Sequence, residues 1–293
     1  MRSVNSQREE LPRFESLPHR SQVQSDSLVT ANTQTSWSAT SEERRAYQSL
    51  QSFSNRIARF CARLQNAFID LIHSSKPIEA SSPELYEILS RSRVRTDIND
   101  HLPTLFIESL NTKPRLIIEL GVRDGESTFV FERVARLCDA RVVSVDIKPA
   151  SRLSQDERWR FVQSDDIEFA KRFPAWCREN GLPKEIDILF IDTSHFFEHT
   201  VQEIAHWFPL LAPRAKVFFH DTNLRRIYFR KDGSMGVAWS NRGVIRALEK
   251  FFSKNFNERE EFTASINGWV ITHYAQCSGF TILTRNPLKS ENR

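Results

Sequence analysis

The amino-acid sequence predicts an α/β fold, with a doubly wound, seven-stranded and mostly parallel sheet covered by helices on both faces. Short apolar segments alternate with amphipathic segments after residue 114. Two of the apolar segments end abruptly in acids and histidines, a pattern typical of buried parallel strands whose carboxyl ends open into a crevice. A third ends in a turn with two glycines directly before a helical pattern. Together these three observations indicate one α/β domain at residues 114–286.

The alternation places each element of this domain. Strands are expected at residues 115–120, 141–146, 160–163, 186–191, 216–220, 269–274 and 280–285. Helices are expected at residues 127–137, 167–180, 200–211 and 242–256. The last two strands are joined by a segment that contains Gln276-Cys-Ser-Gly279, which predicts a hairpin.

The chain outside this domain has a different composition. Residues 1–40 are rich in Ser, Gln, Arg and Thr and are expected to form a disordered tail, and residues 287–293 a C-terminal tail. Residues 41–113 are expected to form a helical extension with an amphipathic helix over residues 41–73, followed by two shorter helices. The apolar stripe of the long helix either packs on its own domain or pairs with a second copy, so this helix is the candidate surface for a homo-oligomer.

Composition excludes several classes of protein. The 293 residues are 40% hydrophobic, enough for one main domain with a sizeable core. The net charge of +4 comes from dispersed basic and acidic residues, which argues against nucleic acid as a partner. The four cysteines have no paired spacing, so a reducing cytoplasm fits better than an oxidising compartment. No run reaches the roughly 18–20 apolar residues that cross a membrane.

The turn after the first strand is a candidate cofactor site. Gly121 lets the backbone turn tightly and approach a ligand, and Gly125 lets the helix start lie close to it. The spacing differs from Gly-x-Gly-x-x-Gly, and no Lys follows Gly125, so neither a dinucleotide nor a phosphate-loop site is indicated. A cofactor without a pyrophosphate fits best, although a plain strand-to-helix turn uses the same residues.

Acids at the next two strand ends strengthen this interpretation. Asp146 ends the second strand, where a carboxylate accepts hydrogen bonds from ribose hydroxyls. Asp165 and Asp166 follow the third strand, near the place expected for an adenine amino group.

The fourth and fifth strands end in a candidate metal site. Asp192 and Asp221 follow neighbouring strands of the predicted sheet, so their carboxylates can share a divalent cation. His195 is the candidate general base for a substrate hydroxyl, and His220 is a third candidate ligand. The alternatives are that either acid only caps a turn, that His195 is a hydrogen-bonded loop residue, and that His220 points elsewhere.

Glu119-x-Gly121-x-x-x-Gly125, Asp146, and Asp192-x-x-His195 with His220-Asp221 resemble the class I S-adenosylmethionine-dependent methyltransferases, a Rossmann-like family. The resemblance covers about residues 82–285 and is greatest for the branch of cephalosporin hydroxylase-type and sugar O-methyltransferase proteins. It implies that Glu119 and Gly121 contact the methionine portion of the cofactor, that Asp146 contacts the ribose, and that Asp165 or Asp166 contacts the adenine region. Relatives hold magnesium with acids at the strand ends. His220 departs from that pattern, because imidazole suits manganese better than magnesium.

The resemblance therefore implies a metal-assisted O-methyltransferase that acts on a hydroxyl of a small molecule, such as a sugar or a natural-product intermediate, with Mg or Mn as the cation. Two other functions remain open from the sequence. One is a hydroxylase-like, oxygenase-supporting protein, because His195, His220 and Asp192 imitate an iron site with two histidines and one carboxylate. The other is a non-catalytic assembly partner that keeps a relic of the cofactor pocket.

Overall fold

The computed structural model describes residues 80–225, 227–229 and 235–285. The predicted tails and the predicted helix over residues 41–73 lie outside these residues, so they remain predictions. Within the described part, no helix is both long and apolar enough to span a membrane.

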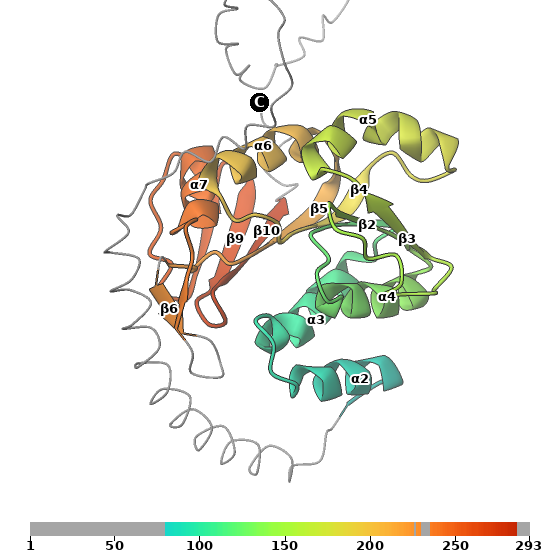
Figure 1. Ribbon diagram of the computed structural model, residues 1–293, viewed down its shortest axis with the longest axis horizontal. Helices are drawn as coiled ribbons and strands as arrows, with labels where there is room; N and C mark the ends of the chain where they lie inside the picture. Colours follow the sequence, from blue (N-terminus) through green and yellow to red (C-terminus); the bar gives the residue numbers. More distant parts are fainter. Residues whose placement is uncertain (1–79, 226, 230–234, 286–293) are drawn as a thin grey trace, which may run out of the picture.

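One eight-stranded sheet organises the molecule, in the order β3-β2-β1-β4-β5-β10-β9-β8 (Figure 1). The first five strands in this order run parallel, and the other three are antiparallel. The strands of this sheet are β1 (Leu116–Leu120), β2 (Arg141–Asp146), β3 (Trp159–Gln163), β4 (Ile186–Ile191), β5 (Leu211–His220), β8 (Phe262–Ile266), β9 (Trp269–Tyr274) and β10 (Phe280–Arg285). The predicted doubly wound α/β fold is confirmed, and the sheet has one strand more than predicted. A separate two-stranded hairpin consists of β6 (Ile227–Phe229) and β7 (Met235–Val237).

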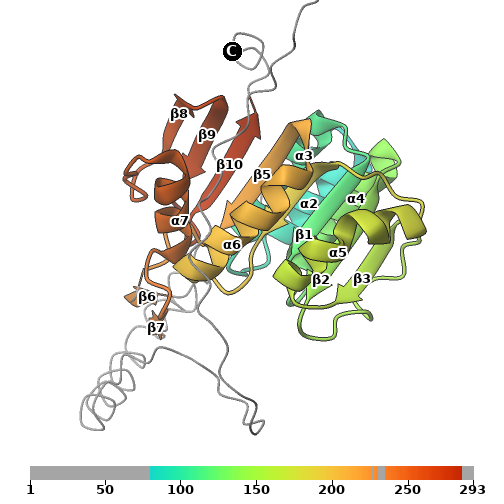
Figure 2. The ribbon, with the colours of Figure 1, turned by 90° about the horizontal axis from the view of Figure 1, so that it is seen from above.

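Helices cover both faces of the sheet. They are α2 (Pro83–Ser92), α3 (Leu102–Thr112), α4 (Glu126–Cys138), α5 (Asp166–Glu179), α6 (Phe197–Trp207) and α7 (Gly243–Phe252), with short 3-10 turns at Asn99–His101 and Phe208–Leu210. The helices α2, α3 and α4 lie on one face, and Figure 2 looks onto the other face, which α5, α6 and α7 cover.

Two predicted helices end earlier than expected. The helix expected over residues 200–211 ends at Trp207, because Pro209 has no amide hydrogen for the helix and Leu211 already pairs with Ile186 as the start of β5. The helix expected to reach residue 256 ends at Phe252, where Ser253 takes a left-handed conformation with φ of 52°.

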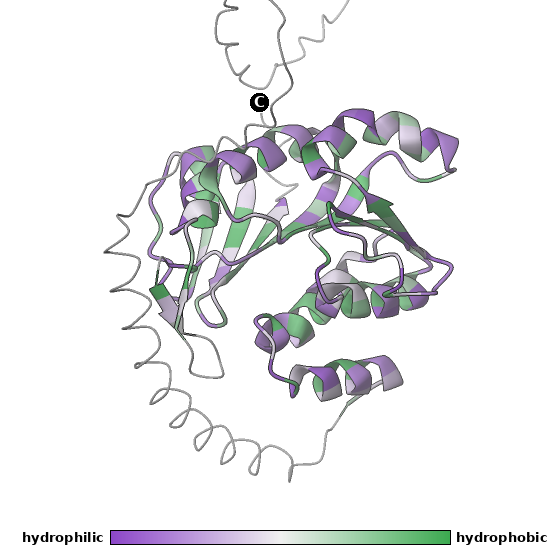
Figure 3. Cartoon of the chain, in the orientation of Figure 1, coloured by the Kyte–Doolittle hydropathy of each residue, from purple (hydrophilic) through white to green (hydrophobic). Residues whose placement is uncertain are grey.

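The alternation of β1 builds two cores. Leu116, Ile118 and Leu120 face α5, α6 and α7, where they join a cluster that contains the aromatic rings of Phe173 and Trp207. Ile117 joins the opposite cluster with residues of α3 and α4. The central strands β1 and β4 are mostly apolar, and green predominates in the middle of the sheet in Figure 3, because both faces are covered. Glu119 is the exception on β1, and it belongs to the candidate site.

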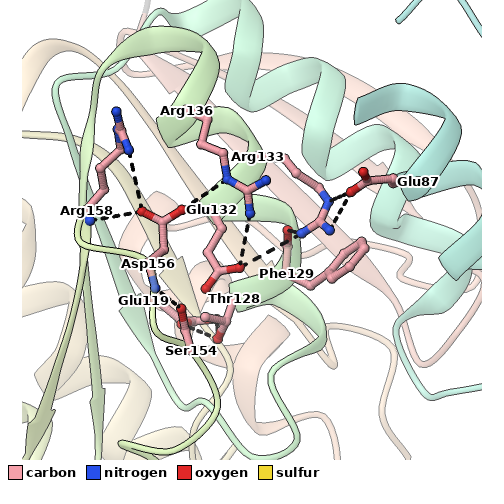
Figure 4. Close-up of polar contacts among 10 residues, drawn as sticks. All are labelled: Glu87, Glu119, Thr128, Phe129, Glu132, Arg133, Arg136, Ser154, Asp156 and Arg158. Carbon is pink, nitrogen blue, oxygen red and sulfur yellow. Dashed lines mark hydrogen bonds and ion pairs between the residues drawn. The ribbon is translucent and has the colours of Figure 1, made fainter. Parts of the chain in front are cut away.

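Arg133 joins α4 to α2 (Figure 4). Its Nε donates to Glu87 Oε2 at 2.6 Å, one terminal nitrogen donates to the Phe129 carbonyl at 2.8 Å, and its guanidinium lies 3.2 Å from the centre of the Phe129 ring. Arg136, one turn along, donates to Asp156 Oδ2 in the loop before β3 at 3.0 Å. Only 11% of the Arg133 side chain is exposed, against 45% for Arg136.

This difference in exposure leads to a prediction on stability. We expect Arg133→Ala to lower the free energy of unfolding by about 2 kcal/mol, because it removes charged hydrogen bonds together with buried packing on Phe129. Arg136→Ala, the matched control, should cost less than about 1 kcal/mol, because solvent screens its exposed ion pairs. Urea unfolding at neutral pH measures both values. Equal losses for the two variants would contradict the role given to Arg133.

Candidate functional site

The loop after β1 lies against the backbone that follows β4. Gly121 has φ of +85°, and its amide donates to the Val145 carbonyl at 2.9 Å. A Cβ on Gly121 would lie 2.0 Å from the carbonyl oxygen of Asp192, so no other residue fits this position. Gly125 caps the amino end of α4. The candidate cofactor loop and the candidate metal strand are therefore in direct contact.

Asp146 holds this glycine loop in place from the end of β2. Its Oδ2 accepts hydrogen bonds from the amides of Val122 at 2.9 Å and Arg123 at 3.3 Å, and its Oδ1 accepts one from the Lys148 amide at 2.8 Å. The carboxylate thus lies beside Gly121, at the carboxyl edge of the sheet where α/β proteins bind ligands.

Glu119 is completely buried behind the loop. It accepts hydrogen bonds from Ser127 Oγ at 2.5 Å, from Thr128 Oγ1 at 2.8 Å and from the Ser144 hydroxyl. Burial raises the pKa of Glu119 to about 7, although the three hydroxyl donors oppose the shift. Contact with a cofactor would require the Glu119 carboxylate to leave these partners, so in this conformation it braces α4 against β1 and β2.

The two acids after β3 have separate surroundings. Asp165 is the amino-terminal cap of α5, and its Oδ1 accepts from the Glu168 amide at 3.0 Å. Asp166 is buried and faces α6, where His199 Nε2 lies 3.0 Å from its Oδ1. Of the two predicted adenine contacts, Asp165 is therefore the more accessible.

Asp192, His195 and Asp221 converge at the ends of β4 and β5. These strands are parallel neighbours, with Ile191 paired to Phe219. His195 Nε2 lies 3.0 Å from Asp192 Oδ1 and 3.1 Å from Asp221 Oδ2. One ligand atom from each of the three residues fits within 4.8 Å of the others, the spacing of a metal-binding group.

His220 lies next to the same two carboxylates. Its Nδ1 lies 3.3 Å from Asp192 Oδ1 and 3.6 Å from Asp221 Oδ2, and its ring is 1% exposed. Its Nε2 is buried and has no hydrogen-bond partner within the described residues. The structure thus brings together all four residues that the sequence predicted for the chemistry.

The charges in this cluster depend on one another. Burial lowers the pKa of His220, but the negative charges of Asp221 and Asp192 outweigh it and raise the pKa to about 10. Burial likewise lowers the pKa of His195, while the hydrogen bond to Asp192 and the charge of Asp221 raise it to a larger extent. Burial raises the pKa of Asp192, yet the neighbouring His220 and His195 hold it far below its usual range. Burial raises the pKa of Asp221, although the charges of His220 and His195 oppose the shift. The two imidazoles and the two carboxylates thus stabilise one another's charged forms.

Backbone strain positions two of these residues. His195 and Asp221 have φ of 60° and 57°, in the left-handed region that non-glycine residues rarely adopt. Gly243, the first residue of α7, packs against the first of these turns. A Cβ on Gly243 would lie 2.1 Å from the His195 carbonyl oxygen. The position of His195 between two carboxylates follows from this turn.

Two further residues of this region were not predicted from the sequence. His199 and Glu203 lie one turn apart on α6, next to Asp166. Thr193 Oγ1 donates to Glu203 Oε1 at 2.5 Å, which connects them to the loop after Asp192. Their spacing of four residues was the available signal, although His199 lies just before the expected start of the helix at residue 200.

Comparison with known proteins identifies a family that part of the chain matches. A family model described as "Methyltransferase domain" matches residues 118–222, from β1 to just past β5. This segment is a methyltransferase domain. The matched region contains every predicted site residue, and the predicted methyltransferase family is confirmed at this level. Whether the chain belongs to the cephalosporin hydroxylase-type branch remains a prediction.

One curated relative covers more of the chain. The uncharacterized protein y4gI of Sinorhizobium fredii (strain NBRC 101917 / NGR234) is 27% identical over 151 residues. The match includes 47% of this chain but spans only 16% of that longer protein.

Solved structures of methyltransferases resemble the chain at low identity. MycE from the mycinamycin biosynthetic pathway, in complex with Mg, SAH and mycinamycin VI, is 17% identical with a TM-score of 0.46, and the match covers 73% of this chain and 57% of MycE. A putative caffeoyl-CoA O-methyltransferase from Staphylococcus aureus is 14% identical with a TM-score of 0.47, and the match covers 76% and 99% of the two chains. At such values we draw no conclusion on chemistry from either.

The close approach at Gly121 leads to a stability prediction. Gly121→Ala should lower the free energy of unfolding by about 3 kcal/mol or more, because it adds a clash with the Asp192 carbonyl to the strain of a positive φ. Gly181→Ala is the matched control, since Gly181 also has a positive φ but has open space around it, and it should cost about 1–2 kcal/mol. Thermal and urea unfolding measure both. Equal effects would show that contact with Asp192 does not constrain the loop.

The raised pKa of Glu119 leads to a prediction on pH. Folding raises this pKa from its usual 4.5 to about 7, so ionisation destabilises the folded protein progressively as the pH rises through this interval. The shift corresponds to about 3 kcal/mol. Relative to wild type, Glu119→Gln should therefore gain about this much stability between pH 4.5 and pH 8. Urea unfolding across this range measures the gain, with the exposed Glu198→Gln as control. A constant difference between Glu119→Gln and wild type would refute the shift.

Proposed function

We propose that this chain is an S-adenosylmethionine-dependent, divalent-metal-assisted O-methyltransferase that acts on a hydroxyl of a small molecule such as a sugar or a natural-product intermediate. The observation that carries the proposal is the convergence of Asp192, His195 and Asp221 beside the Gly121 loop. The methyltransferase domain over residues 118–222 supports the reaction class. The acceptor is the least constrained part, because this fold hosts many substrates.

The donor atoms at the strand ends fit a divalent cation. Asp192 and Asp221 supply hard carboxylate oxygens, which suit magnesium or manganese, and the nearby imidazole of His220 favours manganese. When bound, the cation supplies a Lewis acid that lowers the pKa of a coordinated substrate hydroxyl. About a quarter of the side-chain surface of Asp192 and His195 is exposed, which leaves room for a substrate oxygen.

His195 has the position of a general base, but its charge depends on its partners. Burial lowers the pKa of His195, but the hydrogen bond to Asp192 and the charge of Asp221 raise it overall, which favours the protonated form. A cation held by Asp192 and Asp221 would offset their negative charge and so favour the neutral form of His195. The neutral imidazole would be placed to accept the hydroxyl proton of the acceptor.

The other half of the site would orient the methyl donor. S-adenosylmethionine supplies an activated methyl group when bound. Asp146 and Gly121 shape the edge of the loop where the nucleoside would lie, and Asp165 lies at the end of the neighbouring strand. Glu119 acts from behind by holding α4, which fixes the loop in place. Since methyl transfer needs donor and acceptor in line, this rigidity is the main contribution of the cofactor side.

A second candidate function has a specific observation behind it. His195 Nε2 and His220 Nδ1 lie 3.0 and 3.3 Å from Asp192 Oδ1, so two imidazoles and one carboxylate could hold iron as in oxygenases. Product mass separates the two functions, because methyl transfer adds a methylene unit to the acceptor and oxygenation adds an oxygen atom.

Reciprocal variants test the proposed function. Asp192→Asn should remove one equivalent of bound Mn²⁺ and abolish methyl transfer to hydroxylated acceptors, while the affinity for S-adenosylhomocysteine changes less than about three-fold. Asp146→Asn should do the reverse, with S-adenosylhomocysteine binding weakened at least about ten-fold, because a bidentate carboxylate contact is lost. Calorimetry measures both ligands, and radiolabelled methyl donor measures transfer.

Two outcomes would contradict the proposal. A folded wild-type protein that does not bind S-adenosylhomocysteine removes the cofactor assignment. An Asp192→Asn variant that retains wild-type Mn²⁺ binding and turnover removes the metal role of the strand ends.

A further inference from the structure

A second cluster of metal-ligating residues lies between α5 and α6, which pack side by side on one face of the sheet (Figures 1 and 2). Asp166 is the first residue of α5, and His199 and Glu203 lie one turn apart on α6. One ligand atom from each of the three lies within 4.8 Å of the others. This cluster shares no residue with the one at Asp192.

Two carboxylate oxygens of this cluster are buried without a partner. Glu203 is 0% exposed and Asp166 is 6% exposed. Within the described residues, neither Glu203 Oε2 nor Asp166 Oδ2 has a hydrogen-bond partner. Buried polar atoms are nearly always paired, because an unpaired one costs its full desolvation free energy. Two such atoms on adjacent carboxylates indicate a binding site for a polar or cationic group.

We propose that Asp166, His199 and Glu203 bind a second divalent metal ion, for which zinc is the best match. The ligands are one imidazole nitrogen and two carboxylate oxygens, a set that zinc accepts together with a water molecule. His199 Nε2 lies 3.0 Å from Asp166 Oδ1 and 3.6 Å from Glu203 Oε1. Zinc bonds of about 2.0–2.1 Å in a tetrahedron require ligand atoms about 3.3 Å apart, which both of these distances approach.

A protonated histidine is the competing explanation for the cluster. The hydrogen bond to Asp166 raises the pKa of His199 to about 9, and burial together with the charge of Asp166 raises the pKa of Glu203 to about 7. A protonated His199 can balance the charge of Asp166 while Glu203 holds a proton, but within the described residues this state gives neither Asp166 Oδ2 nor Glu203 Oε2 a hydrogen-bond partner. A divalent ion would neutralise both acids, and carboxylates that turn or bind it through both oxygens would bring Asp166 Oδ2 and Glu203 Oε2 into contact with it.

The second ion would also brace the first site. Glu203 Oε1 accepts the Thr193 hydroxyl, and Thr193 directly follows Asp192 in the loop that carries His195. An ion held by Glu203 would fix this loop from behind. The role is structural and does not depend on methyl transfer, so it can be tested apart from the proposed function.

The test measures the amount of zinc bound to a variant that lacks the first metal site. Asp192→Asn/Asp221→Asn should bind one equivalent of Zn²⁺ after equilibrium dialysis against micromolar zinc, as measured by mass spectrometry of the metal, and zinc should raise its unfolding temperature. Addition of His199→Asn should reduce the bound zinc below about a tenth of an equivalent and abolish the temperature shift. His206→Asn, on the same helix but outside the cluster, is the matched control and should keep the full equivalent.

Glu203→Gln in the same background guards against misfolding of one variant, since it keeps the shape of the side chain. Circular dichroism reports the fold of each. Loss of zinc in a folded His199→Asn or Glu203→Gln protein supports the site. The proposal is overturned if the background variant binds no zinc, or if it binds zinc that neither substitution removes.

Discussion

The candidate site depends on the parallel pairing of β1, β4 and β5 in the middle of the sheet. β4 lies between the other two, so the residues that follow all three strands meet at one edge. The Asp192 amide extends the pairing by donating to the Leu120 carbonyl at 2.9 Å, which leaves the Asp192 side chain directed past the strand. A shift of either strand by one residue would turn these side chains to the other face. The register of three apolar strands therefore determines whether the acids can act together.

That arrangement places two carboxylates close together in a buried site, and neighbouring histidines balance their negative charge. Asp192 and Asp221 would repel each other if both were ionised alone, and the imidazoles of His195 and His220 offset this repulsion. Glu119 shows the same constraint without a neighbouring cation. Its three hydroxyl donors offset only part of the rise in pKa that burial causes. Such uncompensated costs are expected at functional sites, where ligand binding supplies the missing interaction.

Sequence periodicity predicted the parallel strands and most helices, because these elements are long and strongly patterned. β8 was missed since none of its residues is fully buried and it forms the edge of the sheet, although the Asn267-Gly268 pair before β9 is a hairpin signal. The convergence of Asp192 with Asp221 was predictable from strand order. The place of His195 was not, because it depends on a left-handed turn packed against Gly243. Glu203 was missed because burial of an acid on α6 arises only from packing against α5.

The two candidate metal clusters have similar residues but differ in solvent exposure, and this difference separates their roles. At the first, the side chains of Asp192 and His195 are 27% and 25% exposed, so an ion there keeps a face open for a substrate oxygen. At the second, Glu203 is fully enclosed and Asp166 nearly so, and only His199 reaches the surface with 26% of its side chain exposed. A catalytic metal needs a coordination position that substrate can reach, and the burial of Glu203 and Asp166 restricts such access at the second cluster. We therefore infer that chemistry is confined to the ends of β4 and β5, while the cluster on α5 and α6 stabilises the loop that carries it.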